Sequence, residues 1–137
     1  MKRPSPSFLP TTQTRTIQDP ETELLVSTFA DRIQILISQK SGKVGTMLSC
    51  SHEFSHIDNS HTYHIETLLG DRNDALNSVY ARQIMERLVK LGDGINCPPL
   101  LLGITLNGKS SQEDFKLIVD EVVALYQDAI RAIGANS

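Results

Sequence analysis

Apolar and polar residues alternate through much of the first half of the chain, with the two-residue period of β-strands. The alternation is clearest at Ile33, Ile35 and Ile37, and a Ser-Gly-Lys-Val-Gly segment at 41–45 separates it from a second β-prone run that ends at Cys50. Glycines favour such turns because they adopt positive φ at little cost. The pattern over residues 31–51 therefore predicts a β-hairpin at the centre of a sheet.

Further strands are predicted on both sides of this segment. Residues 11–18 are Thr-rich and polar, as in an edge strand, whereas residues 22–29 and 62–69 alternate more regularly. Their short connections favour an antiparallel meander. Residues 100–106 (LLLGITL) are apolar on both faces, which predicts an interior strand.

Two segments have the three- and four-residue apolar spacing of amphipathic helices. The first runs to about Leu91 and can be capped by Asn73 or Asp74. The second begins with a capping-box pattern, either Ser110 with Glu113 or Ser111 with Asp114.

The order of these segments predicts an α+β fold. We expect an antiparallel sheet of five to six strands, a meander plus one later strand, with both amphipathic helices on one face. A single domain would span 11–137 after a flexible tail at 1–10, which is rich in Pro and Ser.

Helices on one face leave the other face of the sheet uncovered, and an extensive exposed apolar face is typical of a protein interface. We therefore predict a homodimer or heterodimer formed through the sheet. Seven apolar strand residues are assigned to this interface, namely Leu24, Val26, Ile33, Ile35, Ile37, Leu102 and Ile104.

Composition narrows the possible partners and the compartment. The net charge is -3 and no basic stripe is present, which argues against nucleic-acid binding. No apolar run reaches the roughly 20 residues of a membrane-spanning helix. Without a signal peptide or a metal-binding spacing, Cys50 and Cys97 are expected to be reduced thiols in the cytosol or nucleus.

All four histidines lie between His52 and His64, in a segment that also contains acidic residues. The polar run 52–60 (HEFSHIDNS) is interpreted as an exposed loop, and such loops on rigid scaffolds often bind partners. A metal site is the alternative, since imidazole and carboxylate suit zinc or iron, but a loop does not fix converging ligands. The candidate binding residues are His52, Glu53, Phe54, His56, Asp58 and His61.

The sequence contains no pattern that supports an enzyme, and no cofactor is expected. The segment around Gly42 and Lys43 lacks the earlier glycine and the following Ser or Thr of a phosphate-binding loop. No GxSxG motif is present, and nothing builds a triad around Cys50 and His52.

Several of these segments together resemble the proteasome assembly chaperone 3 family. The similar stretches, which occur in the family's order and spacing, are 29–39 (FADRIQILISQ), 42–49 (GKVGTMLS), 67–70 (TLLG) and 100–106 ahead of Lys109 and Ser110. The chain departs from the family pattern at its Pro-rich start, in the His-rich segment and at 92–99.

The resemblance implies a non-catalytic chaperone whose fold is an antiparallel sheet with helices on one side. Members pair by sheet packing, with themselves or with the related chaperone 4, and the pair binds alpha subunits to guide assembly of the 20S proteasome alpha ring. Contacts to the ring lie at least partly on exposed loops, which makes 52–61 the matching surface here. Two alternatives stay open: a scaffold module with another client, and a metal-binding protein that uses the histidine segment.

Overall fold

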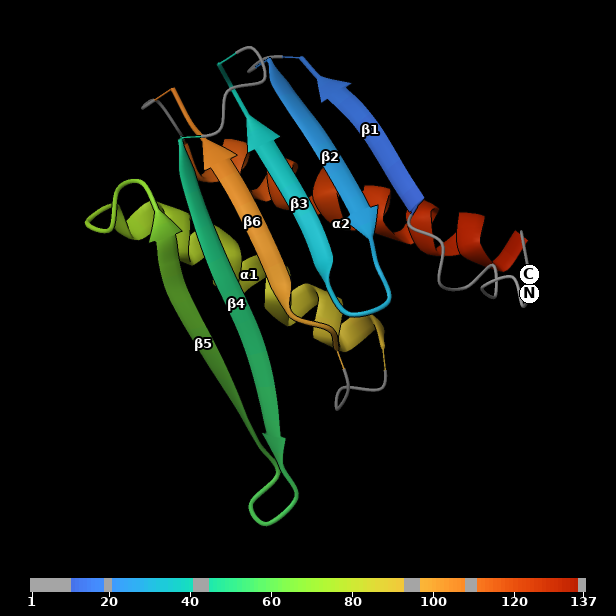
Figure 1. Cartoon of the computed structure of the whole chain (residues 1–137). Helices are drawn as coiled ribbons and strands as arrows, with labels where there is room; N and C mark the ends of the chain where they lie inside the picture. The colour runs from blue at the N-terminus through green and yellow to red at the C-terminus, as the bar shows by residue number, and fades with distance from the viewer. Residues whose placement is uncertain (1–10, 19–20, 41–44, 93–96, 108–110, 136–137) are drawn as a thin grey trace, which may run out of the picture.

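The computed structural model describes residues 11–18, 21–40, 45–92, 97–107 and 111–135. The expected tail at 1–10 and the centre of the glycine turn at 41–44 lie outside these ranges. Within the described part, the chain forms one sheet and two helices (Figure 1).

The elements follow the order predicted from the sequence. They are β1 (Thr11–Ile17), β2 (Thr22–Thr28), β3 (Ile33–Ser38), β4 (Thr46–Ser55), β5 (Ser60–Leu69), α1 (Ala75–Leu91), β6 (Leu100–Thr105) and α2 (Gln112–Ala135). The six strands of the described residues form a single sheet in the order β1-β2-β3-β6-β4-β5. The α+β class is therefore confirmed.

The predicted hairpin over residues 31–51 is wrong, because β6 lies between β3 and β4. β6 pairs in parallel with β3 and antiparallel with β4, so the sheet is mixed although most of its pairs are antiparallel. Since β6 is apolar on both faces, an interior position removes more of its surface from water than an edge would. Just after β3, the Gln39 amide donates to the carbonyl of Thr105, the last residue of β6, at 2.8 Å.

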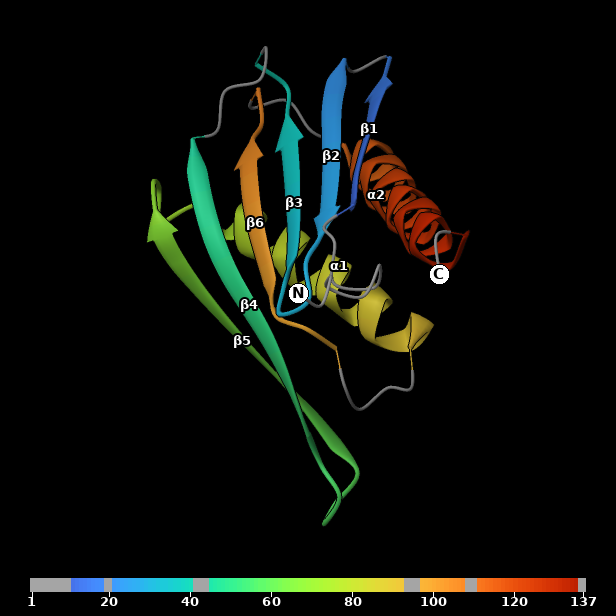
Figure 2. The same cartoon turned by 45° about the vertical axis from the view of Figure 1, so that its right-hand side comes forward.

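Both helices cover the same face of the sheet, as two views of the molecule show (Figures 1 and 2). α2 packs against β1 and β2, whereas α1 packs mainly against β4 and β5 and also contacts α2. The core lies between these layers and contains alternate residues of the four interior strands together with Tyr80, Ile84 and Val122.

Each helix begins at a side-chain cap that the sequence predicts. The Asp74 carboxylate accepts from the Leu76 amide at 3.0 Å at the start of α1. At the start of α2, the Asp114 amide donates to the Ser111 hydroxyl at 3.1 Å, and the Ser111 amide donates to the Asp114 carboxylate at 3.3 Å. These bonds satisfy amides that have no partner within the helix.

β1, the edge strand, is tied to α2 by one arginine. Arg15 donates to Glu121 at 2.8 Å and to Asp128 at 2.9 Å. The hydrogen bond to Glu121, aided by both carboxylate charges, raises the pKa of Arg15 despite partial desolvation. Because strand residues alternate between faces, this contact directs Thr14 and Thr16 to the uncovered face.

β5 ends at Gly70, whose φ is 100°. A Cβ at this position would clash with the Gly45 carbonyl oxygen and lie 2.7 Å from the Thr46 Cα, so both the backbone conformation and the close approach of β4 require glycine. In the described residues, neither helix is long and apolar enough to cross a lipid bilayer.

Candidate protein-interaction site

The seven residues predicted as a partner interface lie in the core, beneath the helices. Each is at most 2% exposed, and they are Leu24, Val26, Ile33, Ile35, Ile37, Leu102 and Ile104. They therefore offer no surface to a partner while the helices are in place. An interface formed by packing onto a face of the sheet therefore has to use the opposite face, which we call the open face.

The open face has its own apolar row across the interior strands. Leu25 on β2 is opposite Leu36 on β3, and Leu36 is opposite Gly103 on β6. Gly103 is in turn opposite Met47 on β4. Paired strand residues share a face, so these positions form a continuous band in which Gly103 adds no side chain.

The leucines and the methionine of this band are only partly buried, as is the neighbouring Leu101. Among the described residues, no helix or strand covers this face, which is turned toward the viewer in Figure 1. These residues were not predicted from the sequence, because the more apolar set of strand residues was assigned to the partner interface. The available signal was the second set of apolar residues in the same strands, at Leu25, Leu36 and Leu101.

A shallow hollow of about 300 Å³ lies at the β1 end of this band. Leu25 and Leu36 provide its apolar walls, and Thr14, Thr16 and Glu23 stand at its rim. An apolar floor with a polar rim is the usual arrangement of a protein interface.

The predicted loop at 52–60 is also wrong, since most of it belongs to strands. β6 pairs with β4 only over Thr46–Cys50, whereas β4 continues to Ser55 and β5 begins at Ser60. Residues 51–64 therefore form a two-stranded arm that projects beyond the rest of the sheet (Figures 1 and 2). Only a short turn at 56–59 remains, with Asn59 at φ 54°.

One face of the arm carries a continuous row of rings. Neighbouring ring centroids lie 4.9 to 5.1 Å apart in the order His56, Phe54, His61, His52, Tyr63. At the base of the arm, the Arg82 guanidinium from α1 lies 5.2 Å from the centre of the Tyr63 ring. We call this surface the ring face of the arm.

Within the row, two imidazoles form a direct hydrogen bond. His52 Nε2 and His61 Nδ1 are 2.7 Å apart, and the rings are stacked at an interplanar angle of 24°. The second nitrogen of His52, Nδ1, is buried and has no hydrogen-bond partner among the described residues. Burial and, secondarily, the charge of a protonated His61 lower the pKa of His52 below its ordinary value of 6.5.

The two acidic members of the predicted loop do not join this row. Glu53 lies on the opposite face of the arm, where its carboxylate is 3.5 Å from His64 Nε2. Asp58 lies in the turn and accepts from the Ser60 hydroxyl at 2.7 Å, which lowers the pKa of Asp58. The most exposed large apolar side chain is Ile57 at the tip, at 99%.

This arrangement does not gather metal ligands. Within the described part of the chain, no group of three or more His, Cys, Asp or Glu side chains is placed to hold a metal ion. A metal on His52 Nε2 would require a proton on Nδ1, and that buried nitrogen has no acceptor. The ring face therefore suits contact with a protein better than coordination of an ion.

A family comparison supports the first of the readings left open by the sequence. A model of the family described as "Proteasome assembly chaperone 3" matches residues 35–124, more than half of the chain. The chain belongs to the proteasome assembly chaperone 3 family. The match runs from β3 into α2, so in this chaperone-family chain it includes the arm and the part of the open face on β3, β6 and β4, whereas Leu25 on β2 precedes it.

A solved structure has the same fold. It comes from the crystal structure of a novel chaperone complex for yeast 20S proteasome assembly, with a TM-score of 0.62 and 18% sequence identity. The similarity covers 86% of this chain and 98% of the yeast chain. No curated protein matches the sequence closely enough to be counted as a relative.

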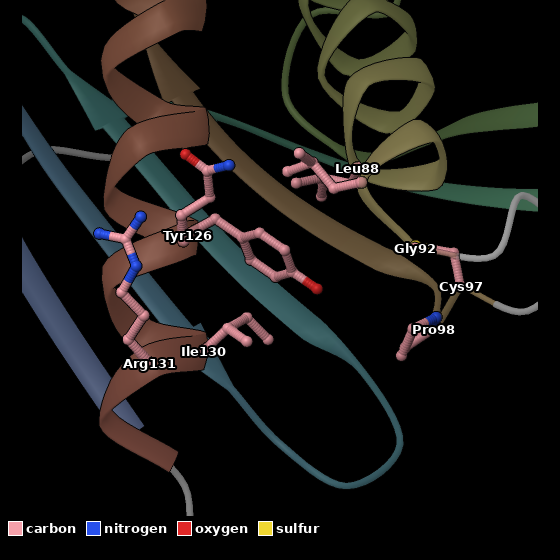
Figure 3. Close-up of a pocket in the computed structure, with 9 residues that line it drawn as sticks. Leu88, Gly92, Cys97, Pro98, Tyr126, Ile130 and Arg131 are labelled. Carbon is pink, nitrogen blue, oxygen red and sulfur yellow. The ribbon is translucent and has the colours of Figure 1, made fainter. Parts of the chain in front are cut away.

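This member of the chaperone family also has a groove on its helix side, between the end of α1 and α2 (Figure 3). The groove has a volume of about 350 Å³, with Leu88 and Ile130 among its apolar walls. Tyr126 projects from α2 into the groove, and Cys97 lies across from it. Burial, followed by the influence of Cys97, raises the pKa of Tyr126.

The two cysteines of the chain, neither of which is in a disulfide, differ in their surroundings, and we expect alkylation to distinguish them. Cys50 is fully buried, and desolvation raises its pKa to about 11, whereas Cys97 is partly exposed in the groove. At about pH 8 only about one Cys50 in a thousand is a thiolate, the form that reacts. Iodoacetamide should therefore modify Cys97 on the folded protein and leave Cys50 free, as mass spectrometry of peptides would show. In urea both cysteines should react, and rapid modification of Cys50 on the folded chain would contradict the structure.

Proposed function

We propose that the chain is a non-catalytic chaperone that pairs through its open face and promotes assembly of the 20S proteasome alpha ring. Membership of the proteasome assembly chaperone 3 family supports a role in proteasome assembly. The observation that carries the pairing is the uncovered apolar band of Leu25, Leu36 and Met47. The partner is either a second copy or a chaperone 4-like protein, whose similar sheet would cover this band.

In this proposal the arm contacts an alpha subunit while the open face is occupied by the other chaperone. The arm projects beyond the sheet, and its ring face is not covered by α1 beyond Tyr63. Aromatic side chains on a projecting element are common anchors of protein interfaces. The absence of a disulfide at Cys50 and Cys97 fits action in the cytosol or nucleus.

Binding free energy alone would drive this function, with no bond made or broken. A chaperone pair that holds neighbouring alpha subunits raises their effective concentration and restricts their relative orientation. Surfaces used by the chaperone are meanwhile closed to other, premature contacts.

Reconstitution tests the proposal directly. Recombinant alpha subunits would be mixed with the chain, with and without a chaperone 4-like partner, and ring formation followed on native gels. We expect faster accumulation of complete alpha rings, and a stable complex between the chaperone and at least one single alpha subunit. An unchanged rate together with no binding to any alpha subunit would refute the proposal and would favour a scaffold with another client.

A further inference from the structure

The hydrogen bond between His52 and His61 restricts where the protons of the two rings can be. His52 Nε2 and His61 Nδ1, 2.7 Å apart, share one hydrogen. If His52 Nε2 carries it, the buried Nδ1 of His52 is an unprotonated nitrogen with no partner. If His61 Nδ1 carries it, His52 must hold its own hydrogen on Nδ1, and a donor is buried without an acceptor.

The first arrangement costs less, because an unpaired buried donor loses a full hydrogen bond to water. The neutral pair is then built from His52 donating through Nε2 to His61, whose Nε2 faces solvent on an exposed residue. In this arrangement neither ring buries an N–H group without an acceptor.

An added proton has no suitable position in this pair. On His52 it would go to Nδ1, which is buried and unpartnered. On His61 it would go to Nδ1, the nitrogen that accepts the hydrogen bond. Either the bond breaks or His52 changes tautomer and buries an unpaired donor.

We propose that the His52–His61 hydrogen bond is a proton-sensitive latch that keeps the two strands of the arm packed at neutral pH and opens on acidification. The bond joins β4 to β5 in the part of the arm that β6 does not support. It also lies in the middle of the ring row, so its loss separates Phe54 and His56 from Tyr63. The proposal concerns the arm itself and does not depend on the client it contacts.

The other charged groups around the latch are few. On the ring face, His56 lies against Phe54 at the tip, and Arg82, paired with Glu86, lies over Tyr63 at the base. Arg82 keeps its charge throughout the range in which histidines titrate. It therefore adds a constant positive charge near the base of the ring row and further disfavours a second cation there.

On the opposite face of the arm, His64 lies beside an acid, Glu53, and not beside a second imidazole. Protonation of His64 strengthens its contact with the Glu53 carboxylate, 3.5 Å away. Asp58, in the turn, lies beside Ser60 and has a lowered pKa, so it stays ionised while histidines titrate. Only the ring face therefore loses a contact when histidines become charged.

The sign of the effect follows from His52. Its pKa in the folded chain is lower than the ordinary 6.5, so the folded state binds fewer protons than the unfolded state. The latch contributes fully above pH 6.5 and is lost as pH falls below that value.

Amide hydrogen exchange across the arm provides the test. After correction for intrinsic rates, we expect exchange at 52–63 to accelerate several-fold, up to about tenfold, relative to β2 and β3, between about pH 7.5 and about pH 5.5. Nitrogen-detected NMR of the imidazoles should show the Nε2–H tautomer of His52 at the higher pH. An arm whose exchange tracks β2 and β3 over this range would overturn the latch.

Matched variants separate the latch from other titrations. His52→Phe and, independently, His61→Phe keep a ring in the row but cannot titrate, so both should abolish the pH response of the arm. His64→Gln and His56→Gln should retain it, since neither removes the hydrogen bond between His52 and His61. A response that survives both phenylalanine variants would assign the effect to another group and refute the proposal.

Discussion

Replacing Ile35 with aspartate is expected to unfold the protein. Ile35 is 0% exposed on β3, where its register partners on the two sides are Val26 and Leu102. All three belong to the core beneath the helices, so a carboxylate there would have no cation and little water. Such burial costs roughly 4 kcal/mol or more, a large part of the ~5–15 kcal/mol that stabilises a typical domain.

Circular dichroism during urea unfolding measures this loss, with Ile35→Val as the matched control. The valine variant removes one methyl group at the same position and should lose only about 1 kcal/mol. A wild-type unfolding midpoint for Ile35→Asp would show that this face of β3 is not covered by the helices.

The elements themselves could be predicted from the sequence because their patterns are local. Two-residue alternation predicted β2 and β3, and capping residues beside apolar stripes predicted both helix starts. The pairing of β3 with β6 could not be predicted in this way. The pairing depends on whether β4 or β6 is stabilised more by the position beside β3. The short connection between β3 and β4 favoured β4 in the prediction, whereas β6 occupies this position.

Alternation also does not show which face of a strand is covered. β3 has apolar side chains on both faces, with Ile35 and Ile37 on one and a single leucine, Leu36, on the other. The helices cover the more apolar face, where burial stabilises the fold most, and the weaker set is left for the open face. The sequence-based prediction instead assigned the isoleucines of β3 to the interface, although they lie under the helices.

The arm was missed because both of its faces meet solvent beyond β6. Without a core to face, the strands need no alternation of aliphatic and polar residues, and the segment has the composition of a loop. A signal was present in the rings: His52 and Phe54 are two apart, as are His61 and Tyr63. Two such pairs on either side of a short turn are typical of a hairpin whose rings pack across the strands.

Replacing Leu36 with aspartate, one residue from Ile35, is expected to abolish pairing while the chain remains folded. Leu36 is partly exposed on the open face, beside Leu25 and Gly103 in register. In the isolated chain the new carboxylate can reach water, so the free energy of unfolding should fall by only about 1 kcal/mol. In a sheet-to-sheet pair the same carboxylate would be buried without a partner.

The cost of that burial sets the size of the effect. A loss of about 4 kcal/mol corresponds to association roughly 1,000-fold weaker, since each 1.4 kcal/mol is a factor of ten. Sedimentation velocity at micromolar concentration would measure self-association, and co-purification from a joint expression would measure binding to a chaperone 4-like partner. Lys116→Asp is the control, because Lys116 is exposed on α2, on the helix side of the molecule, and an acid near a helix start is tolerated.

The neighbouring substitutions at Ile35 and Leu36 together distinguish the two faces of one strand. If Ile35→Asp unfolds the chain and Leu36→Asp abolishes only pairing, the core must lie under the helices and the partner must bind the open face. If Leu36→Asp is folded and pairs as tightly as the unaltered chain, the interface does not lie on the open face. Pairing through the free edge of β1 or β5 would then become the leading explanation, since these strands have no neighbour on their outer side among the described residues.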